Sequence, residues 1–128
     1  MTVLTGIFII LHGLVHMWYV VLSYQGVAYQ PDMGWNGKSW LFSSILPQAT
    51  VRSITGILFI LATIAFVISG IGIFIKAEWL NIFILSSAIF STLILTLFWD
   101  GKLEMIVQKG LIGVLINLAI IAVVLIRR

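Results

Sequence analysis

The fold is decided by residues 53–75, which read SITGILFILATIAFVISGIGIFI and contain no Asp, Glu, Lys or Arg. A helix needs about 20 mostly apolar residues to cross the hydrocarbon core of a bilayer, and this stretch is long enough. Three further stretches have a similar character: residues 3–24, 79–99 and 106–126. The last has its apolar core at 110–126, preceded by an expected interfacial turn. The sequence therefore predicts four membrane-spanning helices.

The composition of the whole chain agrees with this prediction. Hydrophobic residues make up 62% of the 128 residues and charged residues 9%, whereas soluble globular proteins contain about 45–50% and about 25%. A soluble domain of this size has too little interior to bury so much apolar surface. The apolar runs are continuous, whereas the strands of a membrane barrel would alternate in polarity over about 10 residues. We therefore expect one all-α domain over residues 1–128, an antiparallel four-helix bundle that is multi-pass in the cell membrane.

The connections between the predicted spans differ in length. Residues 76–78 are so few that spans two and three must form an antiparallel hairpin, whereas residues 25–52 form a long loop between spans one and two. Within this loop, residues 39–46 read SWLFSSIL and lie between a glycine and Pro47. Ser39 suits a helix N-cap and Pro47 would end the segment. We expect a short helix or turn here, lying at the membrane surface and covering one end of the bundle.

Four spans divide the connections between two sides of the membrane. The terminal side holds both chain ends and residues 76–78, and the loop side holds the long loop and residues 100–109. The terminal side has three basic residues and the loop side has four: Lys76, Arg127 and Arg128 against Lys38, Arg52, Lys102 and Lys109. This balance leaves the membrane orientation open. The scattered cations form no basic face, so nucleic acid is not an expected partner. The chain has no cysteine, which excludes disulfides, thiolate metal sites and thiol nucleophiles.

Two histidines lie near the middle of the first span and are candidate functional residues, because polar groups inside a membrane are costly. The i, i+4 spacing of His12 and His16 places both rings on one helix face. We expect them to face the bundle interior, where they could hydrogen-bond as neutral groups, share a metal ion, or serve a proton or a ligand. A haem would take only one axial ligand from this helix.

Other candidates come from the remaining spans. Asn117 lies near the middle of span four, while Arg52 and Asp100 lie at the loop-side ends of spans two and three and could equally be interfacial anchors. We expect a cavity of about 300 Å³ or more, open on the loop side and lined by His12, His16, Asn117, Trp18 and Trp99. If the histidines and Asn117 instead bond one another, the distances should be about 3 Å and the cavity should be absent.

Small residues recur at helical spacing and predict close helix packing, within the bundle or in a dimer. They are Gly6 and Gly13 on span one, Ala62, Ala65, Ser69 and Gly72 on span two, and Ser87 and Ser91 on span three. No phosphate-binding loop, Ser–His–Asp arrangement or pair of carboxylates within the spans is found in the sequence. An enzyme is therefore less expected than a non-catalytic protein.

The first two spans, LTGIFIILHGLVH and RSITGILFILATIAFVISGIGIFI, resemble those of DoxX-like proteins, a family of small four-helix membrane proteins. The shared features are the size, the HG pair in the first span and the glycines of the second. The chain differs in lacking an acidic residue in its second span and in having His16 where a lysine is usual. The resemblance implies an accessory membrane protein, near quinone or thiol redox chemistry.

The sequence leaves three functions open. The first is an accessory or scaffold protein that associates with itself or with a larger membrane complex. The second is a redox subunit that binds a lipid, a quinone or a haem in a loop-side pocket around His12 and His16. The third is a small transporter subunit, for which the spans offer neither a buried acid nor an interrupted helix. Membrane lipids are expected neighbours in every case.

Overall fold

The computed structural model describes residues 1–23, 37–104 and 106–127, and all regular secondary structure in these residues is helical. The main helices are α1 (Val3–Ser23), α2 (Gln48–Phe74), α3 (Leu80–Leu97) and α4 (Ile112–Ile126), and a short π-helix, η2 (Val107–Leu111), precedes α4. Within the described residues, four helical segments are long and apolar enough to cross a membrane. The prediction of an all-helical chain with four such segments is confirmed.

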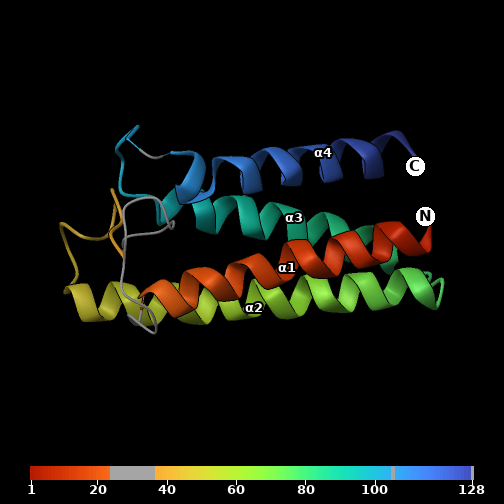
Figure 1. Ribbon diagram of the computed structural model, residues 1–128, viewed down its shortest axis with the longest axis horizontal. Helices are drawn as coiled ribbons and strands as arrows, with labels where there is room; N and C mark the ends of the chain where they lie inside the picture. The colour runs from red at the N-terminus through yellow and green to blue at the C-terminus, as the bar shows by residue number, and fades with distance from the viewer. Residues whose placement is uncertain (24–36, 105, 128) are drawn as a thin grey trace.

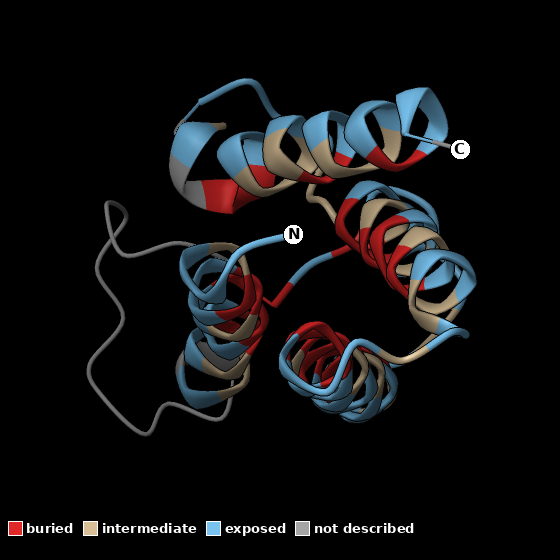
Figure 2. Cartoon of the chain, turned by 90° about the vertical axis from the view of Figure 1, so that its right-hand side faces the viewer, coloured by how far each residue is buried: buried red, intermediate tan, exposed pale blue. Residues whose placement is uncertain are grey.

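The helices lie alongside one another and share the long axis of the molecule (Figure 1). Both chain ends and the turn between α2 and α3 lie at one end, and the segments that precede α2 and follow α3 lie at the other. The end-on view shows that the buried residues of each helix face a common interior (Figure 2). The two sides that were expected from the sequence thus correspond to the two ends of the molecule.

Glycines bring α1 and α2 into close contact. A Cβ atom on Gly13 would lie 2.6 Å from Cβ of Phe66, and one on Gly70 would lie 2.8 Å from the backbone oxygen of Gly6. Distances this short leave no room for a side chain, so the two backbones approach each other directly. Ala62 and Ser69, in the predicted stripe on α2, are also fully buried. The small residues therefore serve packing within the chain.

The helix boundaries differ in part from those predicted. α2 begins at Gln48, earlier than residue 53, because Pro47 stands just before the first helical turn, a position where its ring does not clash. Arg52 consequently lies inside α2. Before α4, Gly110 adopts a φ of 114°, which separates η2 from the straight helix at the predicted interfacial turn.

The expected turn in residues 39–46 is present and covers the loop-side end of the helices. Ser39 begins it, since its Oγ accepts a hydrogen bond from the backbone N–H of Phe42 (3.1 Å) and donates one to the backbone oxygen of Leu97 (2.6 Å). The ring of Phe42 stacks on that of Phe98, with 5.1 Å between the ring centroids. These contacts fix the turn to the end of α3, and its position at a membrane surface stays a prediction.

Candidate functional site

The two histidines of α1 are buried in the interior, as predicted, and lie beside α2. Only 6% of His12 and 2% of His16 are exposed. Their ring centroids are 5.6 Å apart, and the ring of Phe66 lies 4.9 Å from that of His12 and 5.6 Å from that of His16. The i, i+4 spacing on one helix therefore places both imidazoles in the interior.

The hydrogen bonds of His16 define its tautomer. Its Nδ1 lies 3.1 Å from the backbone oxygen of Gly13 and 3.2 Å from that of His12. Because carbonyl oxygens only accept, Nδ1 carries the proton and donates. In a neutral ring Nε2 is then an acceptor, so the hydroxyl of Ser91, 2.7 Å away on α3, donates to it.

Asn117 continues this chain of hydrogen bonds to α4 and back to α1. Its Nδ2 donates to Oγ of Ser91 at 2.8 Å, and its Oδ1 lies 2.8 Å from Nε2 of His12. An amide oxygen accepts, so Nε2 of His12 is the donor. For neutral imidazoles, the order His12, Asn117, Ser91, His16 therefore has one direction of donation throughout.

α2 joins the same cluster through Thr63. Its hydroxyl lies 3.0 Å from the backbone oxygen of Gly13, the group that also accepts from His16, and 3.0 Å from the backbone oxygen of Phe59. Each of the four main helices thus contributes a buried polar side chain at this level. We call His12, His16, Thr63, Ser91 and Asn117 the polar network.

The hydrogen bonds of the polar network join the four helices to one another. Each side-chain hydrogen bond between helices lowers the cost of placing a polar group in an apolar interior. Three of the four ring nitrogens are bonded: Nε2 of His12 and Nε2 of His16 within the network, and Nδ1 of His16 to the backbone. Among the described residues, no group of three or more His, Cys, Asp or Glu could hold a metal ion. The two histidines also come from one helix, so this donor set does not fit a haem between opposite ligands.

The histidines border a cavity of about 130 Å³, which we call the histidine cavity. Its lining is His12, Val15, His16, Tyr19, Leu95, Val107, Ile112, Gly113 and Ile116. This volume is well below the roughly 300 Å³ of a typical small-molecule site. Among the described residues this cavity includes His12 and His16 but not Asn117, Trp18 or Trp99, so the predicted lining is not brought together there, and Asn117 bonds His12 directly.

The other predicted site residues lie away from the histidines. Trp18 is 42% exposed, which places it on the outer surface of α1. Trp99 lies beyond the end of α3, where its Nε1 donates to the backbone oxygen of Lys102 at 3.1 Å. Arg52 lies close to Gly37, since a Cβ on that glycine would be 3.1 Å from Nε of the arginine.

Asp100 forms a buried ion pair near the loop-side end of the molecule. Its Oδ2 lies 2.7 Å from Nζ of Lys109, and the two side chains are 3% and 6% exposed, respectively. This pair ties the end of α3 to η2, which leads into α4. Asp100 was singled out from the sequence, but its partner was not. Lys109 follows Asp100 after a short loop, and this spacing could have predicted the ion pair.

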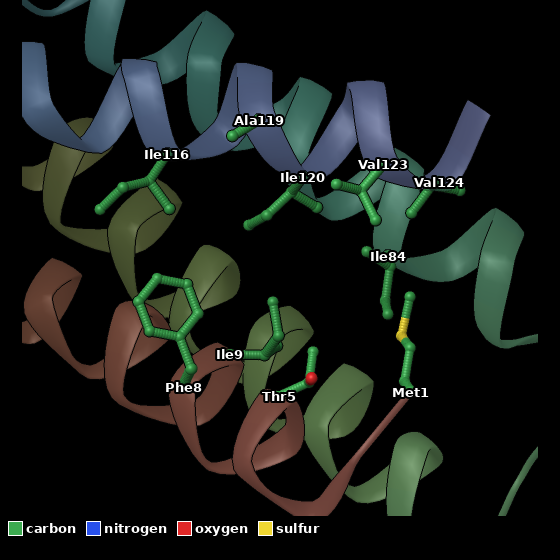
Figure 3. Close-up of a pocket in the computed structure, with 10 residues that line it drawn as sticks. All are labelled: Met1, Thr5, Phe8, Ile9, Ile84, Ile116, Ala119, Ile120, Val123 and Val124. Carbon is green, nitrogen blue, oxygen red and sulfur yellow. The ribbon is translucent and has the colours of Figure 1, made fainter. Parts of the chain in front are cut away.

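A larger cavity separates α1 from α4 toward the terminal side, and we call it the apolar groove (Figure 3). It has a volume of about 250 Å³ and is lined by Met1, Thr5, Phe8, Ile9, Ile84, Ile116, Ala119, Ile120, Val123 and Val124. The side chains of Phe8 and Ile9 point from α1 toward those of Ile116 and Ile120 on α4 (Figure 3). Except for the threonine hydroxyl, the lining side chains are hydrocarbon or thioether.

Sequence reasoning missed Ser91, Thr63 and the groove. Ser91 was read as a small packing residue, although a hydroxyl at mid-span can equally pair with the polar groups predicted on neighbouring spans. The groove has no sequence signal, because its lining residues are the same Ile, Val and Ala that fill a packed interface. No protein-family model, curated protein or solved structure matches this chain.

Proposed function

We propose that this chain is a multi-pass protein of the cell membrane in which the four helices form an antiparallel bundle. The support comes from its outer surface, where large aliphatic side chains are exposed on every helix. Examples are Leu11 (56% exposed), Ile57 (59%), Ile82 (66%) and Leu115 (55%). In water an apolar surface of this extent would be an aggregation or interaction site. In a bilayer the same side chains face lipid.

Within the membrane, we propose that the protein acts as an accessory subunit or scaffold. The observation that carries this proposal is the polar network, in which the polar side chains of four helices are used to bond one another. Such an arrangement supports a structural role, since groups that act on a substrate must present donors or acceptors to it. A relationship to the DoxX-like proteins is part of the same proposal.

The surface offered to a partner is the outer face of α4. This helix has only two buried residues, Asn117 and Val124, fewer than any other described helix of similar length. Leu115, Leu118 and Leu125 are each half exposed or more. A second copy or a subunit of a larger membrane complex would complete the packing of α4, where van der Waals contact is the main source of helix association in lipid.

Site-directed photo-crosslinking tests this proposal cleanly, because the chain has no native cysteine. Leu115→Cys and Leu118→Cys would carry a maleimide-linked benzophenone on α4, and Ile57→Cys and Ile82→Cys would be the matched controls on α2 and α3. After illumination in native membranes, we expect protein adducts from the two α4 positions and few from the controls. Adducts of equal yield from all four positions, or lipid adducts alone, would contradict a partner surface on α4.

The alternative of a redox subunit has less support from the structure. A quinone or haem would need more room than the 130 Å³ of the histidine cavity, and three of the four histidine ring nitrogens are bonded within the chain. A lipid is different, because the apolar groove offers hydrocarbon contacts without requiring the histidines.

A further inference from the structure

The apolar groove has the shape and chemistry of a site for a hydrocarbon chain. On α4 its lining runs from Ile116 to Val124, which corresponds to about 12 Å at the helical rise per residue. A helix with its side chains is roughly 10–12 Å across, so a second transmembrane helix cannot enter a space of about 250 Å³. A flexible acyl chain can.

At its terminal-side end the groove meets a second cavity, which we call the basic cleft. Met1 lines both cavities. The basic cleft has a volume of about 330 Å³, and its lining includes Lys76, Asn81 and Arg127. These residues bring two cationic side chains and an amide to the mouth of the groove. Glu78 lies in the same turn between α2 and α3 and is the acidic residue nearest to Lys76 in the sequence.

The backbone conformation at Lys76 does not require a lysine. The residue adopts a φ of 51° just after α2. The N–H of Ala77 donates to the backbone oxygen of Gly72 at 3.0 Å, and the N–H of Lys76 donates to the backbone oxygen of Ile73 at 3.3 Å. This is the helix-ending pattern in which glycine is the usual residue. Lysine therefore places a cation at the cleft in a backbone conformation that favours glycine.

We infer that the groove and the cleft together bind an anionic phospholipid. One acyl chain lies in the apolar groove between α1 and α4, and the phosphate lies in the basic cleft near Lys76 and Arg127. The apolar and cationic parts are adjacent in the same order as in the lipid, from the bundle interior to the membrane surface. This inference rests on the membrane insertion proposed above, but it does not depend on a protein partner at α4.

Binding can be measured with the full-length protein in detergent by native mass spectrometry. Phosphatidylglycerol and phosphatidylcholine with identical acyl chains are the two probes. We expect retention of phosphatidylglycerol at lower lipid concentration than phosphatidylcholine. Replacing Lys76 by glycine should weaken the preference about fivefold, the effect of one basic residue near a lipid surface, and Arg127→Gln should act similarly. The Lys76→Gly variant keeps the fold, because glycine suits this backbone conformation.

The acyl-chain part has its own pair of variants on α4. Ala119 lines the groove and Ala122 does not, although both are exposed on the same helix. Ala119→Phe should fill the groove and reduce retention of phosphatidylglycerol several-fold, while Ala122→Phe should leave it unchanged. Equal retention by both variants would overturn the groove as the acyl site.

Two further outcomes would also overturn the inference. Competition by millimolar inorganic phosphate that fully displaces the lipid would mean a headgroup ion site alone. Loss of a dimer in Ala119→Phe, with lipid retention unchanged, would mean that a second copy covers the groove. Because crosslinking from Leu115 and Leu118 does not measure lipid binding, the lipid inference and the partner proposal can fail separately.

Discussion

The two inward-facing sides of α1 differ in how closely they pack on the neighbouring helix. Toward α2 it presents Gly6 and Gly13, and the backbones approach so closely that a Cβ atom would collide with the neighbouring helix. Toward α4 it makes one described side-chain hydrogen bond, from His12 to Asn117, with the apolar groove and the histidine cavity lying along the same boundary. The first boundary is filled by packing. The second is held at one point, with space on either side of it.

This difference separates a closely packed pair of helices from a boundary that contains cavities. α1 and α2 form the closely packed pair, in which Phe59 and Phe66 of α2 are buried, and α3 packs on both α2 and α4. α4 packs on α3, the Asp100–Lys109 pair joins the end of α3 to the segment before α4, and the polar network links α4 to α1. Because α4 meets α1 through one described side-chain hydrogen bond, space remains between these two helices, and the apolar groove lies there.

The largest expected effect comes from breaking the ion pair that anchors the start of α4. Lys109→Met should destabilise the protein by about 3 kcal/mol, because Asp100 is left buried without its cation. Chemical denaturation in detergent, followed by circular dichroism, measures the loss. The double variant Asp100→Leu with Lys109→Met should recover most of it. A single variant as stable as the parent would show that the pair does not anchor α4.

The comparison is tested by adding one methyl group between α1 and α2 and another on α4 where Gly113 lines the histidine cavity. Gly70→Ala should cost about 2 kcal/mol, because its Cβ would lie 2.8 Å from a backbone oxygen of α1, which cannot move away. Gly113→Ala, on α4, would meet only Cδ1 of Leu95 at 3.2 Å, and the better helix propensity of alanine should make it neutral or slightly stabilising. Thermal unfolding of both variants measures the difference, and equal losses would contradict the contrast.

Removing the one polar link described between α1 and α4 should have a smaller and more local effect. Asn117→Ala deletes the acceptor of His12 and the donor to Ser91, at a cost of about 1–2 kcal/mol. Hydrogen exchange should rise in α4 more than in α2, because α2 is held by packing. Leu118→Ala, on the exposed face of α4, is the matched control and should change little. A uniform rise over all helices would mean that the network supports the whole molecule equally.

The smallest effect is expected at the turn between α2 and α3, which belongs to neither boundary. Lys76→Gly should raise stability by about 0.5 kcal/mol, because glycine adopts the positive φ of this position more readily than lysine does. The midpoint of denaturant unfolding reports the change. A clear loss of stability would show that the lysine side chain makes contacts that outweigh the backbone preference.

Much of the site could be read from the sequence, but not its arrangement. Polar residues in apolar spans identified His12, His16 and Asn117, because such residues must find partners in an apolar interior. The i, i+4 spacing also gave the shared face of the two histidines. It could not show that Ser91 lies between Asn117 and His16, since that depends on the relative rotation and height of three helices.

By itself the sequence determined the number of apolar helices, their approximate bounds and the turn begun by Ser39. These follow from local properties: the length of an apolar run, the absence of charge within it, and the capping and helix-breaking residues at its ends. Only the tertiary structure decided that α1 packs tightly on α2 and loosely beside α4. The physical reason is that Ile, Val and Leu look alike whether they fill an interface or line a cavity. Packing depends on how side chains from distant segments interdigitate, and no single segment encodes that fit.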